Sequence, residues 1–247
     1  MGTEAPRRPR ERPSKDDGRE RPFVITVDGP AGSGKSTTAR EVARRLGFYH
    51  LDSGALYRGI TLALLRASDG VLNPEAIDGS RIEALDLQVS WDDEGPLIRL
   101  DGAPVPDDDL RARPVTEVVS AVAAVPSVRR WLMEAQRSGA RLPGLVADGR
   151  DMGSVVFPEA QVKVFLQADT KVRAARRLQQ LGTASPTPAE VTREADRLRA
   201  RDASDAGREV APLIVPDGAY VIDTTEVEFE EQVEEILALV GRAQPGD

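Results

Sequence analysis

The segment GPAGSGKS at residues 29–36 restricts the possible folds more than any other part of the chain. It matches the pattern G-x-x-x-x-G-K-[ST], in which a buried strand passes through a glycine-rich turn into a helix. Residues 23–27 are mostly β-branched, as the strand requires, and residues 36–46, before Gly47, fit the helix. The motif therefore predicts a parallel α/β sheet that binds phosphate groups at this turn.

Each residue type in the turn has a role in holding a triphosphate. The glycines allow the backbone to curl until successive N–H groups converge on phosphate oxygens, and the helix adds the positive end of its dipole. Lys35 supplies a mobile cation to the β- and γ-phosphates, the Ser36 hydroxyl is a ligand for Mg²⁺, and Thr37 donates to the α-phosphate. The predicted ATP-binding residues are Gly29, Pro30, Ala31, Gly32, Ser33, Gly34, Lys35, Ser36 and Thr37.

Composition excludes several classes of protein. The 247 residues include no cysteine, which excludes a disulfide scaffold, a thiolate zinc site and a cysteine nucleophile. No stretch approaches the roughly 18 apolar residues of a membrane span, and the N-terminus has no apolar signal core, so we expect a cytoplasmic protein without a membrane partner. The net charge of −8 disfavours nucleic-acid polymers, so a nucleotide must be held by a local cluster of cations.

The predicted elements alternate between strand and helix, which is typical of a parallel α/β sheet. An antiparallel hairpin and a helical stretch interrupt this order before the third parallel strand. Two arginine-rich helices then precede the last strand and a closing amphipathic helix. The predicted strands are 23–27, 48–51, 87–91, 97–100, 145–147, 162–166 and 219–222, and the predicted helices are 36–46, 55–67, 115–124, 127–138, 170–181, 189–203 and 228–240.

This pattern divides the chain into a core with two additions. Residues 1–22 are rich in proline, arginine and glutamate, which predicts a disordered tail, and the interspersed acidic residues argue against a nucleic-acid-binding arm. We expect a P-loop sheet with helices on both faces, an inserted substrate-binding subdomain and a helical lid. The predicted ranges are 23–51, 142–168 and 209–247 for the core, 52–141 for the insert and 169–208 for the lid.

Further motifs distinguish among the many proteins that share this phosphate-binding turn. A GTPase needs a base-specifying Asn-Lys-x-Asp and an Asp-x-x-Gly segment followed by a catalytic glutamine, and the sequence has neither arrangement. Kinases of small acceptors instead have an acceptor pocket after the second strand and a mobile lid that carries arginines. The sequence contains candidates for both.

The chain resembles bacterial cytidylate (CMP) kinases over residues 23–240. Four segments carry the resemblance, namely DGPAGSGKS at 28–36, LDSGALYR at 51–58, ADGRDMG at 147–153 and RDASDAGREVAPL at 201–213. The predicted insert is similar to the extra segment that distinguishes these kinases from adenylate kinases. The resemblance implies a P-loop nucleoside monophosphate kinase, usually a monomer, that uses ATP and Mg²⁺ to convert CMP or dCMP to the diphosphate.

The resemblance also implies an acceptor site at the ends of two parallel strands. It assigns Ser53, Tyr57 and Arg58 to the phosphate and ribose side of CMP. It assigns Arg150 to the acceptor phosphate and Asp151 to the cytidine moiety. From the residues alone, these two opposite charges would simply pair, but ligands of open α/β sheets bind at this edge.

Three further residues complete the expected binding site. The resemblance matches Ser120 and Arg129 of the insert to the cytosine edge, whose O2 and N3 acceptors suit an arginine donor. On spacing alone, Arg129 would be one more charge on a helix surface. Asp148 ends a strand beside the motif strand, so we expect it to orient Mg²⁺, or a water on the metal, from behind Ser36.

Arginines of the two lid helices are candidates for charge stabilisation. Transfer of a γ-phosphoryl group develops negative charge that a guanidinium stabilises, with an effect of about 10³-fold or more on the rate. By resemblance, Arg201, Asp205 and Arg208 also contact CMP. The predicted catalytic residues are Lys35, Arg150, Arg177, Arg201 and Arg208.

Other polar and aromatic residues are expected to lie outside the site. We expect Arg173 and Arg193 on a solvated helix face. The single histidine, His50, is interpreted as part of the core or the end of a strand. Trp91 and Trp131 are expected to pack the insert.

These residues predict in-line attack by a phosphate oxygen of CMP on the γ-phosphorus of MgATP. The acceptor phosphate is already anionic at neutral pH, so catalysis consists of positioning, charge stabilisation and exclusion of water by closure. Two alternatives remain at this point. One is a kinase of the same architecture for another acceptor such as UMP, and the other is an ATP-binding switch without transfer.

Overall fold

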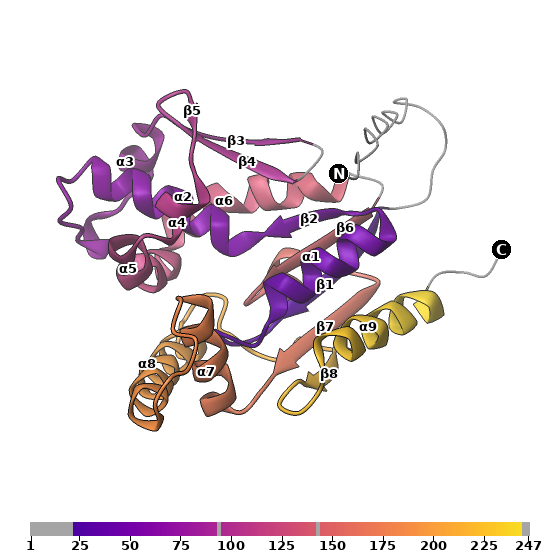
Figure 1. The fold of residues 1–247 in the computed structure, drawn as a ribbon. Coiled ribbons are helices and arrows are strands. Elements are labelled where there is room, and N and C mark those ends of the chain that lie inside the picture. The colour runs from indigo at the N-terminus through magenta and orange to yellow at the C-terminus, as the bar shows by residue number, and fades with distance from the viewer. Residues whose placement is uncertain (1–21, 93–94, 142–143, 244–247) are drawn as a thin grey trace, which may run out of the picture.

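The computed structural model describes residues 22–92, 95–141 and 144–243. Its strands are β1 (Phe23–Asp28), β2 (Tyr49–Asp52), β3 (Leu87–Trp91), β4 (Pro96–Leu100), β5 (Ala103–Pro104), β6 (Gly144–Gly149), β7 (Val162–Gln167) and β8 (Tyr220–Asp223). A five-stranded sheet in the order β2-β6-β1-β7-β8 forms the centre, and the three-stranded sheet β3-β4-β5 lies beside it (Figure 1). The larger sheet is parallel throughout, which confirms the predicted fold class.

The register of the parallel sheet brings the ends of three strands together. Asp28 at the end of β1 pairs with Gly149 of β6, and Asp52 at the end of β2 pairs with Asp148. β1 lies in the middle of the sheet and is buried over five of its six residues, which explains its continuous β-branched composition. Polar residues that follow these strands therefore meet at one edge.

Helices cover both faces of this sheet. α1 and α9 lie side by side on one face, α2, α5 and α6 lie on the other, and α7 and α8 form a pair at the carboxyl edge (Figure 1). The helices are α1 (Lys35–Leu46), α2 (Ser53–Arg66), α3 (Gly79–Glu83), α4 (Asp107–Arg111), α5 (Arg113–Ala124), α6 (Pro126–Ser138), α7 (Thr170–Gln180), α8 (Pro188–Ala206) and α9 (Phe229–Ala243), with shorter turns at Pro74–Ala76, Gly139–Arg141 and Met152–Val156.

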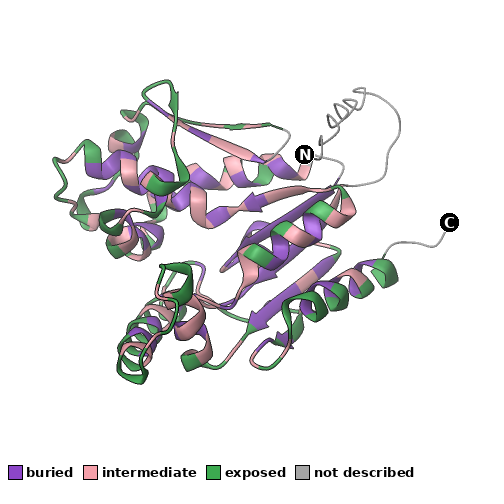
Figure 2. Cartoon of the chain, in the orientation of Figure 1, coloured by how far each residue is buried: buried purple, intermediate pink, exposed green. Residues whose placement is uncertain are grey.

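Two apolar cores lie on opposite faces of the parallel sheet. Val42 of α1 and Ile236 of α9 pack on one face. On the other face a larger core extends from the sheet into the segment between β2 and β6, where Leu64 of α2 is fully buried. Figure 2 shows the buried residues concentrated in the strands and on the inward sides of the helices. As predicted, Trp91 and Trp131 pack against the larger core.

All the predicted strands and helices form, with ends shifted by at most three residues. The largest omissions are the five-residue helices α3 and α4 and the π-helix Met152–Val156, which are too short to give a periodic signal. Of the predicted tail, residues 1–21 lie outside the described part of the chain. Among the described residues, no helix combines the length and the apolar character of a membrane span.

The larger core predicts a measurable stability effect. Replacing Leu64 by Ala removes buried methyl groups and leaves a cavity, so we expect the free energy of unfolding to fall by about 2–5 kcal/mol. The matched control is Leu181→Ala, because Leu181 is 67% exposed, and its change should be within about 0.5 kcal/mol. Urea unfolding followed by circular dichroism measures both, and equal effects would contradict the assignment of Leu64 to the core.

Candidate active site

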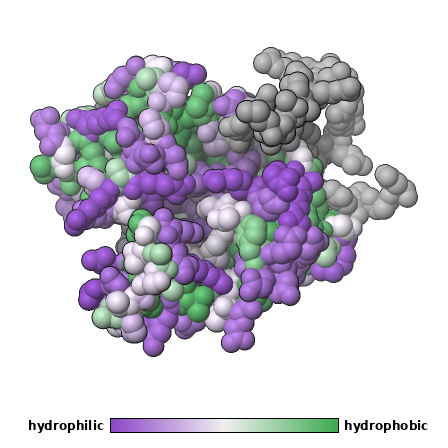
Figure 3. Space-filling view, viewed as in Figure 1, coloured by the Kyte–Doolittle hydropathy of each residue, from purple (hydrophilic) through white to green (hydrophobic). Residues whose placement is uncertain are grey.

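A cavity of about 440 Å³ lies at the carboxyl edge of the parallel sheet. Its wall is formed by the glycine-rich turn, the starts of α1 and α2, the end of β6, and residues of α5, α6, α7 and α8. Figure 3 shows the molecule hollowed between the α7–α8 pair and the parts above it, with hydrophilic residues at the border. The predicted residues in the wall are Ala31, Gly32, Gly34, Lys35, Ser36, Thr37, Ser53, Tyr57, Arg58, Ser120, Arg129, Asp148, Arg150, Asp151, Arg177, Arg201, Asp205 and Arg208.

Gly29, Pro30 and Ser33 shape the turn from outside this wall. A Cβ on Gly29 would lie 2.2 Å from the carbonyl oxygen of Leu166, so only glycine permits this approach to β7. The Pro30 carbonyl accepts a hydrogen bond of 3.3 Å from Lys35 Nζ. The Ser33 N–H donates to the same carbonyl at 3.4 Å, so these three predicted residues shape the turn without lining the cavity.

Positive charge is concentrated in the cavity. Burial, followed by the nearby Arg150, lowers the pKa of Lys35 to about 7. Burial and, after it, the neighbouring guanidinium groups lower the pKa values of Arg58 and Arg201 to about 10. Nε of Arg201 has no hydrogen-bond partner among the described residues. Phosphate oxygens are the groups that would relieve this crowding of buried cations.

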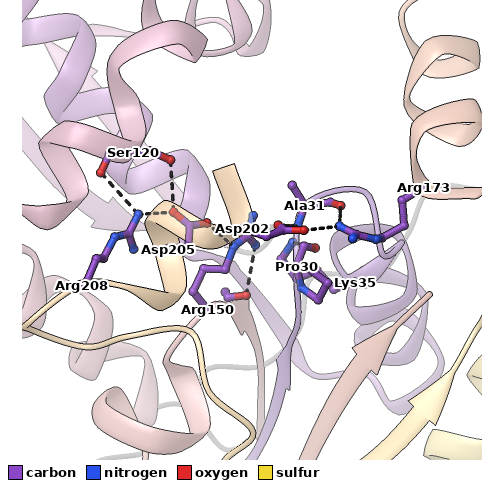
Figure 4. A network of polar contacts seen from close by, with 10 residues as sticks. Pro30, Ala31, Lys35, Ser120, Arg150, Arg173, Asp202, Asp205 and Arg208 are labelled. Carbon is purple, nitrogen blue, oxygen red and sulfur yellow. Dashed lines mark hydrogen bonds and ion pairs between the residues drawn. The ribbon is translucent and has the colours of Figure 1, made fainter. Parts of the chain in front are cut away.

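A polar network joins Asp205 of α8 to Arg150, which follows β6, and to Ser120 of α5 (Figure 4). Asp205 accepts hydrogen bonds of 3.0 Å from Arg150 Nε, 2.5 Å from Arg208 and 3.2 Å from Ser120 Oγ. Among the described residues, Arg150 thus forms its ion pair with Asp205 of α8 instead of with its neighbour Asp151. Among the predicted lid arginines, Arg177 also forms an ion pair, with Glu194 at 3.0 Å.

Arg129 and Asp151, which are predicted to bind cytidine, are buried in the wall of the cavity, whereas Ser120 is half-buried. Arg129 forms an ion pair with Asp151, and both side chains are buried. The Arg129 guanidinium also lies 5.7 Å from the centroid of the Tyr57 ring. Arg129 is therefore an interior group and does not lie on a solvated surface.

Oxygen ligands suitable for Mg²⁺ meet beside Lys35. Ser36 Oγ donates a hydrogen bond of 2.5 Å to Asp148 Oδ2, and His50 Nε2 lies 2.8 Å from Asp148 Oδ1. Burial opposes ionisation of Asp148, but the contacts with His50, Lys35 and Ser36 outweigh it and lower its pKa. The hydroxyl and carboxylate fit a hard cation that keeps most of its ligands from water and phosphate. The interpretation of His50 as part of the core or the end of a strand did not include this contact with Asp148.

Asp28 ties the glycine-rich turn to the residues that follow Arg150 and Asp151. Its buried carboxylate accepts hydrogen bonds of 2.9 Å from Met152 N–H and 2.7 Å from Gly153 N–H, at the start of the π-helix. The sequence places Asp28 at the start of the segment 28–36, but a position at the end of a strand does not by itself assign it a role. The available signal was its place at the first position of that segment.

The expected solvation of Arg173 is wrong. The Arg173 side chain is only 6% exposed, and its NH1 donates to the Ala31 carbonyl at 2.8 Å and to Asp202 at 2.6 Å. It is buried because α7 packs directly on the glycine-rich turn, an arrangement that helical spacing does not reveal. Arg193 is exposed, as predicted.

A second cavity of about 590 Å³ was missed by the sequence analysis. It shares Gly34, Thr37 and Gln180 with the first cavity, so the two adjoin at the start of α1. Its other wall is formed by Arg176 and by residues 225–229 and 232. The loop at 225–228 has no periodic pattern, so its place beside the turn emerges only from the folded chain.

Comparison with known proteins gives a consistent family. A family model described as cytidylate kinase matches residues 25–242. A cytidylate kinase from Marinomonas sp. is 42% identical over 223 residues, covering 89% of this chain and 96% of that protein. Cytidylate kinases from Caldanaerobacter subterraneus subsp. tengcongensis and Chloroherpeton thalassium are 38% and 40% identical, covering 90% and 88% of this chain and 96% and 92% of theirs.

The burial of Asp28 predicts a specific pH dependence of stability. Burial raises the pKa of this carboxyl from 3.8 to about 7, despite the two N–H donors. The folded protein therefore holds this proton after the unfolded chain has released it, and the stability that it contributes is lost as pH rises from about 4 to about 7. We expect Asp28→Asn, which cannot titrate, to gain stability relative to the wild type across this window.

The measurement is urea unfolding of both proteins at several pH values between about 4 and 8. The difference in free energy of unfolding should change through the window and then become constant above it, apart from an offset due to the altered hydrogen bonds. A difference that is independent of pH would show that Asp28 is not protonated in the folded protein.

Proposed function

This chain belongs to the cytidylate kinase family, and we therefore propose that it transfers the γ-phosphoryl group of ATP to CMP or dCMP, giving ADP and CDP or dCDP. The observation that carries the proposal is one cavity whose wall contains both the glycine-rich turn and the residues matched to the acceptor. The γ-phosphate of ATP and the phosphate of CMP can meet there, among buried cations.

The donor occupies the turn and the second cavity in this proposal. N–H groups at the start of α1 and Lys35 hold the phosphates, and Thr37 lies where the two cavities adjoin. The second cavity then accommodates the nucleoside of ATP, beside Arg176 and Gln232. Ser36, with Asp148 behind it, would hold Mg²⁺, which supplies neutralisation of phosphate charge when it is bound.

The acceptor occupies the remainder of the first cavity. Arg58 and Arg150 hold the phosphate of CMP, with Ser53 and Tyr57 beside it, and Asp205 contacts the sugar. The base lies toward the buried pair of Arg129 and Asp151, with Ser120 at its edge. A buried ion pair of this kind is costly unless further hydrogen bonds satisfy its remaining polar atoms. The polar edge of the base would supply such hydrogen bonds.

The reaction in this arrangement is an in-line displacement. A phosphate oxygen of the acceptor attacks the γ-phosphorus and the β-phosphate leaves with ADP. The acceptor oxygen is already anionic, so the protein needs no strong base. Lys35, Arg150, Arg177, Arg201 and Arg208 stabilise the charge that spreads over the transferred group, and the α7–α8 pair excludes water.

The proposal also covers the oligomeric state, the location and the domains of the protein. We infer a monomer that acts in the cytoplasm, with residues 52–141 as the acceptor-binding insert and 169–208 as a lid. Gel filtration with light scattering measures the molar mass in solution and so tests the monomeric state.

A screen of acceptors tests the proposed reaction. With MgATP, we expect CMP and dCMP to give diphosphate products, and UMP and AMP to react at least about 10-fold less efficiently, because a pocket built for hydrogen bonds rejects a base that leaves them unpaired. Chromatography of the nucleotide products measures this directly. Preference for UMP would assign the site to another acceptor, and ATP binding without any diphosphate product would leave only a switch.

Arg150 separates the acceptor from the donor. We expect Arg150→Ala to lower kcat by about 10²–10³-fold, because a charge-stabilising donor is lost, and to leave the Kd of ATP within about 3-fold. Steady-state kinetics and calorimetric titration with ATP measure the two quantities. The matched control is Arg193→Ala, which removes an exposed arginine of α8 and should leave both unchanged. Loss of ATP binding in Arg150→Ala would contradict this division of the cavity.

A further inference from the structure

The α7–α8 pair contacts the glycine-rich turn through both backbone polar groups of Ala31. The Ala31 N–H donates to Asp202 Oδ1 at 3.2 Å, and the Ala31 carbonyl accepts from Arg173 NH1 at 2.8 Å. The same NH1 donates to Asp202 Oδ2 at 2.6 Å, which closes the triangle (Figure 4). One ion pair between the two helices therefore holds one residue of the phosphate-binding turn.

Apolar packing supports the same junction. The Ala31 side chain is buried in a small cluster with Ala174 of α7 and with Ala195 and Leu198 of α8. The α7 backbone also approaches the turn so closely that a Cβ on Gly32 would lie 3.1 Å from the Arg173 carbonyl oxygen. The two helices are thus seated on the turn, and do not merely cover the cavity.

Asp202 is poorly placed for a residue that serves phosphate affinity. A carboxylate beside an anion-binding turn repels phosphate, and it occupies an N–H group of that turn. Arg173 compensates its charge, but the Arg173 guanidinium is itself buried, which adds a desolvation cost. The contacts among Ala31, Arg173 and Asp202 therefore suit a role in fixing the position of a neighbouring group, and not a role in binding the nucleotide.

That neighbour is Arg201. It precedes Asp202 in α8, lines the cavity, and has no hydrogen-bond partner for its buried Nε among the described residues. Its location is therefore determined by the helix that carries it, and Asp202 anchors that helix to the turn one residue further on. A shift of about 1 Å at such a group is enough to cost roughly 10²-fold in rate.

We propose that Asp202 is a positioning residue, which joins the Ala31 N–H to Arg173 and so seats α8 in the register that directs Arg201 at the transferred phosphoryl group. This inference rests on the proposed kinase function. It adds a residue that touches neither phosphate directly and acts through its neighbour in the helix.

Asp202→Asn is the variant that tests the inference. The amide keeps one oxygen for the Ala31 N–H but presents N–H donors where Arg173 needs an acceptor, so the junction is broken with little change in volume. We expect kcat with CMP to fall by at least about 10-fold and the Kd of ATP to stay within about 3-fold. The matched control is Asp196→Asn, which removes a solvent-exposed ion pair with Arg199 in the same helix and should change kcat by less than about 2-fold.

A double-mutant cycle with Arg201→Ala tests the route of the effect. If Asp202 acts through Arg201, adding Asp202→Asn to Arg201→Ala should lower kcat by less than about 3-fold, whereas independent effects would multiply. Multiplying effects, a kcat of Asp202→Asn equal to that of Asp196→Asn, or a parallel loss of ATP affinity would each overturn the inference.

Two measurements keep these outcomes interpretable. Thermal unfolding reports whether each variant is folded, and Asp202→Ser, which also removes the carboxylate, repeats the cycle if the asparagine variant is insoluble. Wild-type protein in the same assay separates the two proposals. Absence of CDP from the wild type would contradict the kinase function, whereas an active wild type with an equally active Asp202→Asn would contradict only the positioning role.

Discussion

The crowding of positive charge in one buried cavity is the constraint on which the rest of the site depends. Arg201 and Lys35 lie among other cations, and burial lowers the pKa of each. Carboxylates offset part of this cost, with Asp205 holding two arginines and Asp151 holding a third. The charges left over match the anionic phosphates of two nucleotides. The free-energy cost of burying like charges is thus concentrated in the cavity where the negatively charged ligands bind.

The residues around this cavity come from distant parts of the chain. The parallel register sets the ends of β1, β2 and β6 side by side, so Asp28, Asp52 and Asp148 meet at one edge. The helices α7 and α8 then add their arginines from the far side of the turn. Residues of the cavity wall therefore come both from the ends of parallel strands and from the helices that pack around them.

The sequence predicts those features that depend on local patterns. The glycine-rich motif, the alternation of strands and helices and the residues matched to the acceptor all have short-range signals, and the structure brings the matched residues to one cavity. The sequence does not predict contacts between segments that are far apart along the chain. Asp28 meets Met152 across 124 residues, and Arg173 meets Ala31 across 142 residues. Arg173 was misplaced for this reason, since a helix surface looks solvated until its packing partner is known.

The insert connects two strands that are neighbours in the sheet. It leaves the carboxyl end of β2 and returns to the amino end of β6, as any crossover between parallel strands must. Its strands form a separate antiparallel sheet, and its helices share the larger apolar core with the central sheet. Because the strands of the insert form their own sheet, a change of length within this connection does not by itself alter the order of the central strands.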